Sequence, residues 1–296
     1  MRRSIGVRIF NVYNIMFMIF LSVITIYPYL NQLAVSLNDG EDTVFGGITI
    51  FPRVFTWQNY ITVFSNAGFL DSLLISFLRV VLGTALGILL ITGAAYALTK
   101  RDLPGKNFMV NLLIIPTFIS GGLIPTYMLY RELHLMNNFL VYVIPMAFVF
   151  YYMIIVRTYF QSIPKSLEES ALIDGANEMQ IMFKIMIPLS MPVMATVTLW
   201  LAVAHWNDWT TSLYFITKKN LYTLQFIMYK VVKEAELVNE MAKASAMSGG
   251  GAQSFKVTAE SVKAATLIVA TFPIVMLYPF LQKYFIQGIM IGAVKE

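Results

Sequence analysis

Six stretches of the chain are dominated by apolar residues, and segments rich in charged residues, proline or glycine separate them. The first runs from Ile9 to Leu37 without a charged residue, which is long enough to cross a hydrocarbon core of roughly 30 Å with a strong tilt or a kink. Because exposed backbone polar groups need water or a protein partner, this pattern predicts an all-α membrane protein with six transmembrane helices. The expected spans are about 9–37, 68–99, 107–130, 139–161, 185–209 and 262–286.

The composition agrees with a bilayer protein, because 58% of the 296 residues are hydrophobic and 12% are charged. Soluble domains carry about 25% charged residues. The first apolar stretch follows Arg2, Arg3 and Arg8, but it is too long for the apolar region of a secretory signal and no small-x-small cleavage site follows it. We therefore interpret it as an uncleaved first span. The absence of cysteine excludes disulfides, thiolate metal sites and cysteine nucleophiles.

The distribution of lysine and arginine predicts the orientation. One set of short flanking segments carries most of them: Arg2, Arg3, Arg8, Lys100, Arg101, Lys106, Arg157, Lys165, Lys184, Lys283 and Lys295. The short loops on the other side carry Arg53 and Arg131, beside Asp39, Glu41, Asp42 and Glu132. By the positive-inside rule both termini are cytoplasmic, as an even number of spans requires. The net charge of +5 therefore reflects topology, and no nucleic acid partner is expected.

We expect one permease domain over residues 1–296 with two polar segments, a cytoplasmic loop over 162–184 and an external region over 210–261. The external region contains Gly249-Gly250-Gly251. A flexible tip explains these glycines better than a phosphate-binding loop, because no strand precedes them and no Lys-Ser/Thr pair follows.

The cytoplasmic loop predicts a short helix that ends in a sharp turn. Ser166-Leu-Glu-Glu169 fits a capping box, and Pro164 discourages a helix continuous with the fourth span. Leu167, Ala171 and Leu172 fall on one side of this helix. Asp174-Gly175 is expected to end it, since glycine readily adopts the left-handed conformation, and Asn177 can cap the next helix.

The same residues resemble a known motif. Glu169-Ser-Ala-x3-Gly175-x9-Ile185-Met-Ile-Pro188 is similar to E-A-A-x3-G-x9-I-x-L-P, the EAA loop of binding-protein-dependent ABC importer permeases. Ser170 replaces the second alanine and Ile187 the leucine. In that family the loop lies between the fourth and fifth of six spans, seats in a cleft of a separate ATPase and transmits its closing motion. The ATPase-coupling residues that the resemblance implies are Glu168, Glu169, Ala171, Asp174, Gly175 and Pro188.

Further segments resemble the carbohydrate branch of the family, the group of the maltose permease. They are His205-Trp-Asn-Asp-Trp209, Tyr278–Phe285 and the tail Gly288–Lys295, where Glu296 stands in place of a final glycine. The resemblance implies an importer of oligosaccharides or polysaccharide fragments in the cytoplasmic (inner) membrane. Its expected partners are a second homologous permease, two copies of an ATPase that uses ATP and Mg, an extracytoplasmic solute-binding protein, the sugar and membrane lipid, with no cofactor bound by this chain.

Candidate residues of the sugar pathway are aromatic or polar and lie near the third to fifth spans. Aromatic rings stack on sugar faces, and amides bind hydroxyl groups. The candidates are Tyr127, Tyr151, His205, Trp206, Asn207 and Trp209. Each has a second interpretation. For the tyrosines it is packing or an aromatic belt at the membrane surface, for Trp206, Asn207 and Trp209 it is such a belt with a helix cap, and for His205 it is a polar residue at a subunit contact. The sequence leaves these alternatives open.

Arg79 lies well inside the second span, where an unpaired charge is costly. Ser76, Arg79, Gly83 and Gly87 share one helical face, and Gly-x3-Gly favours close helix packing. We expect this face to meet another helix, in this chain or in a partner permease. Whether Arg79 serves transport or pairs with a carboxylate or with backbone carbonyls stays open.

The sequence disfavours an enzyme, because it lacks Walker A, H-E-x-x-H and G-x-S-x-G patterns. His134 and His205 are far apart, so neither a catalytic nor a metal site is expected. A secondary transporter is the more distant alternative, since it calls for ionisable residues near the midplane and Arg79 alone approaches this. An ABC permease for a non-sugar solute is the closer alternative.

Overall fold

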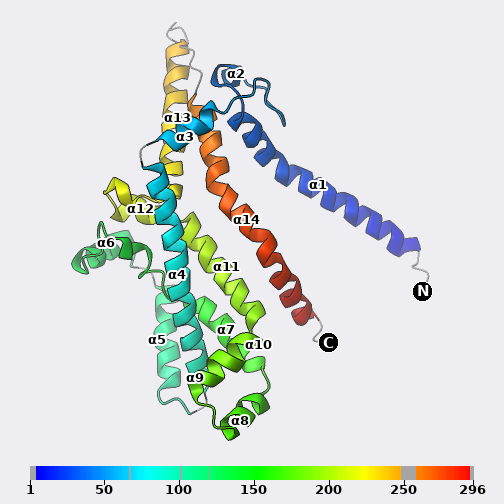
Figure 1. Cartoon of the computed structure of the whole chain (residues 1–296), viewed down its shortest axis with the longest axis vertical. Coiled ribbons are helices and arrows are strands. Elements are labelled where there is room, and N and C mark those ends of the chain that lie inside the picture. Colours follow the sequence, from blue (N-terminus) through cyan, green and yellow to red (C-terminus); the bar gives the residue numbers. More distant parts are fainter. Residues whose placement is uncertain (1–4, 67, 101, 120, 248–257, 294–296) are drawn as a thin grey trace. The chain divides into compact units, whose positions relative to one another are not determined.

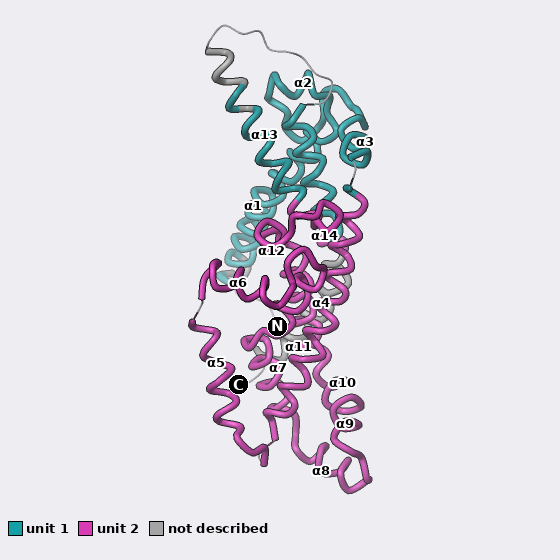
Figure 2. The backbone as a smooth tube through the Cα atoms, turned by 90° about the vertical axis from the view of Figure 1, so that its left-hand side faces the viewer, with its two compact units in different colours: residues 1–69, 227–273 teal, residues 70–226, 274–296 magenta. Residues whose placement is uncertain are grey.

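The structure is a computed structural model that describes residues 5–66, 68–100, 102–119, 121–247 and 258–293 (Figure 1). In these residues it is helical, apart from loops and an isolated bridge between Asn38 and Phe55. Two compact units are formed, residues 1–69 with 227–273 and residues 70–226 with 274–296 (Figure 2). The glycine tip at 249–251 and the side chains of the C-terminal motifs lie outside the described residues.

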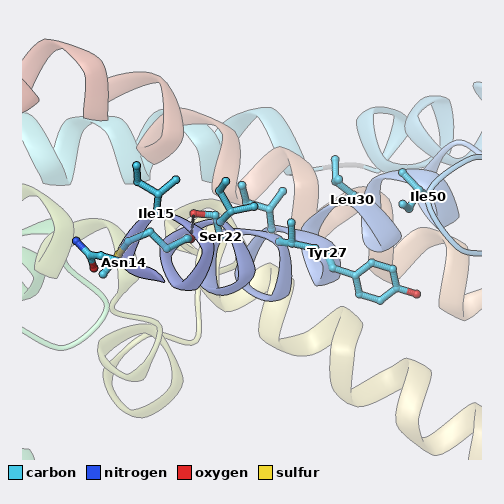
Figure 3. Close-up of a pocket in the computed structure, with 10 residues that line it drawn as sticks. Asn14, Ile15, Ser22, Tyr27, Leu30 and Ile50 are labelled. Atoms are coloured by element: carbon cyan, nitrogen blue, oxygen red, sulfur yellow. Dashed lines mark hydrogen bonds between the residues drawn. The ribbon is translucent and has the colours of Figure 1, made fainter. Parts of the chain in front are cut away.

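The first unit is built around a long apolar helix. α1 is followed by two short helices, and part of α13 and the start of α14 complete the unit: α1 (Ile5–Ser36), α2 (Gly40–Val44), α3 (Gln58–Ser65), α13 (Leu224–Met247) and α14 (Ala259–Ala293). A shallow groove of about 570 Å³ runs along α1 and is lined almost entirely by apolar side chains, among them Ile15, Leu30 and Ile50 (Figure 3). Such a surface suits hydrocarbon or another membrane helix.

A polar hairpin follows α1 in this unit. The Asn38 side chain is fully buried, and its Oδ1 accepts the N–H groups of Arg53 and Val54 at 2.8 and 2.9 Å. Asn38 Nδ2 donates to Asp42 Oδ2 at 2.8 Å, and Arg53 Nε donates to the same oxygen at 2.8 Å. These hydrogen bonds, from Asn38 first and then Arg53, hold the pKa of Asp42 below its ordinary value.

The second unit contains the remaining helices. They are α4 (Phe69–Ala97), α5 (Lys106–Phe118), α6 (Leu123–Glu132), η1 (Phe139–Tyr142), α7 (Phe150–Ser162), α8 (Lys165–Ile173), α9 (Glu178–Ile181), the π-helical η2 (Met182–Met186), α10 (Ile187–Leu189), α11 (Met191–Asn207), α12 (Thr210–Phe215) and η3 (Lys219–Leu221). Its core joins α4, α7 and α11 through buried residues such as Ile91, Met153, Phe160 and Val197.

Among the residues that the structure describes, three helices are long and apolar enough to cross a membrane, over Ile9–Ser36, Phe69–Ala97 and Ala259–Met276. They coincide with the first, second and sixth predicted spans. The fifth predicted span also carries a helix, α11, but the chain bends by 85° between Glu178–Leu189 and Met191–Asn207.

The third and fourth predicted spans are each divided into two helical segments. Between α5 and α6 the chain passes through Gly121 and Gly122, and Gly122 has a φ of 77° that an α-helix cannot contain. Pro125 then lies in the first turn of α6, where the missing N–H costs nothing. In the segment 139–161 the helix α7 begins only at Phe150, because Pro145 removes a helical hydrogen bond and constrains the residue before it.

Candidate functional site

The loop between α7 and α11 forms a short helix, α8, as predicted, but its predicted cap is wrong. α8 begins at Lys165 with Pro164 as N-cap and no side-chain cap, so Ser166 already lies inside the helix. The capping box lies one helix later, at α9. There Asn177 Oδ1 accepts the Gln180 N–H and Gln180 Oε1 accepts the Asn177 N–H, both at 2.9 Å. The expectation that Asn177 caps this helix is confirmed.

The end of α8 is a Schellman turn at Gly175. Gly175 has a φ of 82°, its N–H donates to Leu172 O at 3.0 Å, and the Ala176 N–H donates to Ala171 O at 2.9 Å. This pair of bonds satisfies carbonyls at the helix end and requires a left-handed residue. The predicted stop at Asp174-Gly175 is therefore confirmed, and it separates α8 from α9 by a fixed turn.

Most of α8 faces outward. Ala171 is its buried residue, whereas Leu172 is 48% and Ile173 87% exposed. Glu169 is exposed and has no ion pair among the described residues. A helix with protruding aliphatic side chains and an available carboxylate has the features of a docking surface.

Glu168 differs from Glu169, because it is engaged within the chain. The ammonium group of Lys100, just after α4, forms ion pairs with Glu168 of α8 and with Glu178 of α9. Burial disfavours the charge on Lys100, but hydrogen bonds to these carboxylates raise its pKa. Lys100 is separated from Glu168 by 68 positions, so no local pattern in the sequence indicates it as a site residue.

Pro188 lies close to the bend that leads from α9 into α11. The π-helical turn Met182–Met186 precedes it, and the Ile187 N–H bonds to Met182 O. Pro188 has no N–H to donate, so it also interrupts the regular series of helical hydrogen bonds at this point. π-turns inside helices are frequent at functional sites.

The six candidates for a sugar pathway lie on different helices and differ in exposure. Tyr127 on α6 is 41% exposed and stacks on Phe215, and Tyr151 on α7 is 61% exposed beside Tyr152. Asn207 is exposed and Trp209 half-buried at the end of α11. His205 and Trp206, at 1% and 7% exposure, are buried within the chain.

The polar face of α4 meets α11 of the same chain, which resolves one open alternative. A Cβ atom at Gly83 would lie 2.4 Å from the His205 ring, and one at Gly87 would lie 3.1 Å from Leu201. The Gly-x3-Gly spacing therefore allows α11 to approach α4 closely, as the sequence predicted.

Arg79 is fully buried and forms an ion pair with Asp208. It also donates to Asp208 O at 2.7 Å, and its guanidinium lies 4.8 Å from the centroid of the Tyr142 ring. Asp208 Oδ1 in turn accepts the N–H groups of Thr210 and Thr211 at the start of α12. Arg79 thus pairs with both a carboxylate and a backbone carbonyl.

Tyr142 extends this cluster to neighbouring segments. Its hydroxyl lies 2.8 Å from Ser212 Oγ and donates to Leu221 O at 2.7 Å. Ser76 Oγ of α4 accepts the Leu224 N–H at 2.8 Å. The buried polar residues thereby fix the end of α11, α12 and the segment before α13 against α4. The described residues contain no group of side chains that could hold a metal ion.

Comparisons with known proteins agree with this architecture. Residues 6–291 match the family described as binding-protein-dependent transport system inner membrane component. The chain is 37% identical to protein LplC of Bacillus subtilis, over 97% of this chain and 95% of that protein. It is 33% identical to the polygalacturonan/rhamnogalacturonan transport system permease protein YtcP of the same organism, over 97% and 99%.

A solved structure is also similar. A chain of a bacterial ABC transporter involved in the import of the acidic polysaccharide alginate superposes with a TM-score of 0.84 at 27% identity, covering 96% of this chain and 99% of that chain. The chain studied here therefore belongs to the family of binding-protein-dependent transport system inner membrane components, and it is a permease subunit of an ABC importer.

Proposed function

We propose that this chain is one of two homologous membrane subunits of an importer for oligosaccharides or polysaccharide fragments, and that α8 docks into a separate ATPase. The observation that carries the proposal is the EAA spacing on an outward-facing helix that ends at a left-handed Gly175. Glu169, Leu172 and Ile173 supply the exposed carboxylate and aliphatic groups of the docking face.

The proposed topology has six spans and two cytoplasmic termini in the inner membrane. Three single helices support it directly. In this topology α5 with α6, and the segment from η1 to α7, cross as broken spans, and α11 crosses after the bend at Ser190. Broken helices are tolerated inside a membrane where protein or a water-filled cavity surrounds them, which suits a subunit that lines a path for a polar solute.

The proposed substrate class is an acidic saccharide chain. The YtcP relative is named for transport of polygalacturonan and rhamnogalacturonan, and the similar solved structure for import of alginate. Arg79 is unsuited to bind it directly, because Asp208 already neutralises its charge. The exposed Tyr127, Tyr151, Asn207 and half-buried Trp209 are the better candidates for contact with sugar rings and hydroxyl groups.

The remaining parts of the machine follow from this assignment. A solute-binding protein would deliver the saccharide outside, and two ATPase copies, using ATP and Mg, would bind the α8 helices of the two permeases. Their closure would draw the loops together and open the path outward, and hydrolysis would reset it.

Co-purification from native membranes in mild detergent tests the proposal. We expect a second permease, a P-loop ATPase and a solute-binding protein to accompany the chain. Proteoliposomes of the complex should then import oligogalacturonate in preference to a neutral maltooligosaccharide of equal length, and only with ATP. Isolation of this chain alone, under conditions that preserve other ABC complexes, would contradict the assembly; equal uptake of both saccharides would contradict the substrate class.

A further inference from the structure

We propose that Lys100 is a positioning residue that ties the docking helix α8 to the transmembrane helix α4, so that displacement of α8 by the ATPase moves α4. This inference rests on the proposed role of α8 and adds the route by which its motion enters the membrane. Lys100, Glu168, Glu178 and Tyr96 interact at the end of α4, where α8 and α9 also lie (Figure 1).

Apolar packing holds α8 only weakly. Ala171 is its buried residue, and its neighbours Leu172 and Ile173 are largely exposed. A methyl group removes little apolar surface from water, so a force applied to the exposed face of α8 needs another attachment to reach the membrane helices.

Lys100 supplies such an attachment at three points. Its ammonium group pairs with Glu168 on α8 and lies 2.5 Å from Glu178 Oε2 on α9. It also lies 4.5 Å from the centroid of the Tyr96 ring, and the Tyr96 hydroxyl donates to Glu178 Oε2 at 2.5 Å. One cation therefore joins the end of α4 to both helices of the loop.

The backbone at Lys100 is itself fixed to α4. The Lys100 N–H donates to Ala97 O at 3.2 Å, and the Thr99 N–H donates to Tyr96 O at 3.0 Å. Lys106 Nζ donates to Lys100 O at 2.9 Å from the start of α5. The cation is therefore held on a continuation of α4 and not on a freely moving segment.

An isolated surface ion pair contributes little to the stability of a fold. The role proposed for Lys100 concerns the position of α8 relative to α4, and not the free energy of unfolding. The pairs with Lys100 are about one quarter exposed at Lys100 and at Glu168, and one cation is shared by two carboxylates and an aromatic ring. Such a network restricts geometry, because each partner limits the positions open to the others. The adjacent Glu168 and Glu169 thus have separate roles: Glu168 holds α8 inside the chain and Glu169 faces the partner.

The test compares Lys100→Met with two matched variants in the purified complex, reconstituted in lipid. Lys219→Met removes an exposed lysine of η3, outside the loop, that has no ion pair among the described residues, and Lys100→Arg keeps a cation that can bind two carboxylates. We expect Lys100→Met to retain the co-purifying ATPase but to lower saccharide import per ATP hydrolysed by about tenfold, a usual size for coupling between sites. Lys219→Met should stay at the wild-type ratio, and Lys100→Arg should recover most of it.

A second readout is independent of transport. The chain has no cysteine, so a single Ser166→Cys substitution accepts a spin label on the exposed face of α8. Lys100→Met should increase the mobility of this label in the same complex, and Lys219→Met should not. An unchanged label and an unchanged import ratio would overturn the inference. If no ATPase accompanies the wild-type chain, the proposed function fails, and the label still decides whether Lys100 holds α8.

Discussion

Arg79 and Asp208, 129 positions apart in the sequence, form an ion pair in which the arginine side chain is completely buried. Removing one partner of a buried pair leaves an uncompensated charge and typically costs about 3–5 kcal/mol. We expect Arg79→Met or Asp208→Asn to lower the unfolding temperature strongly. This temperature can be measured in detergent by the fluorescence of a dye that does not require a cysteine thiol, since the chain has no cysteine. The double variant should lose less stability than the sum of the losses in the two single variants, because it leaves no unpaired buried charge.

Asp71→Asn is a suitable control for this experiment, since Asp71 is an exposed carboxylate on the same helix. Strict additivity of the Arg79 and Asp208 effects would mean that the two side chains do not interact energetically.

Gly83 provides a second prediction, because a side chain there meets the His205 ring at 2.4 Å. Gly83→Ala should destabilise the packing of α11 on α4 by about 1–3 kcal/mol. Gly87→Ala, with 3.1 Å to Leu201, should cost less because the leucine can shift. At Gly93 of the same helix a Cβ has open space, and alanine there should be neutral or stabilising by up to about 1 kcal/mol. Thermal unfolding of the three variants should follow this order, and equal losses at Gly83 and Gly93 would contradict the close approach.

The sequence predicted the parts of this fold that depend on local chemistry. The apolar runs of α1, α4 and α14 are long, and Gly175 and Asn177 act on their own neighbours, so pattern and residue type identify them. The exact positions of the breaks inside the third and fourth spans are not evident from hydropathy, because Gly122 and Pro145 change the chain direction without interrupting the apolar composition. The predicted cap at Ser166 lies two residues after the observed N-cap, Pro164, since the capping-box spacing alone does not fix where a helix begins.

The long-range part of the candidate site was not accessible to local patterns. Nothing near Lys100 in the sequence indicates Glu168 or Glu178, and Arg79 gives no indication of Asp208. An unpaired charge inside a membrane span is energetically unfavourable, so the position of Arg79 predicts a partner or a functional role. The structure identifies Asp208 as the partner. His205 and Trp206 belong to a motif that could either contact the sugar or have a structural role. Both side chains are buried within this chain, which favours a structural role.

The polar hairpin after α1 gives a prediction with a pH dependence. Hydrogen bonds from Asn38 and Arg53 lower the pKa of Asp42. The ionised Asp42 carboxylate therefore contributes to the stability of the hairpin above its ordinary pKa of 3.8, and this contribution is lost as the pH falls through the lowered pKa. Asp42→Asn should remove the ion pair at all pH values. Arg53 then loses its Nε bond to Oδ2 but keeps the bonds from Nη2 to Asp42 O and Gly46 O. Because one of its bonds is lost, trypsin should cleave after Arg53 faster in the variant at pH 8, and Glu41→Gln should behave as wild type. Equal cleavage rates would show that backbone bonds to Asn38 hold the hairpin without the carboxylate.

Gly175 yields the prediction most specific to the proposed function. Its φ of 82° lies where non-glycine residues are strained, yet a Cβ there would meet no atom within 4 Å. Alanine should therefore cost about 1–2 kcal/mol through backbone strain alone, and asparagine should cost less because it tolerates this conformation. Valine should be worst. If the turn sets the direction of α8 towards the ATPase, ATP-dependent import should fall in the order glycine, asparagine, alanine, valine, while expression in the membrane changes little. Import that stays at the wild-type level in Gly175→Val would contradict a coupling role for this loop, since the turn would then be free to change without effect on transport.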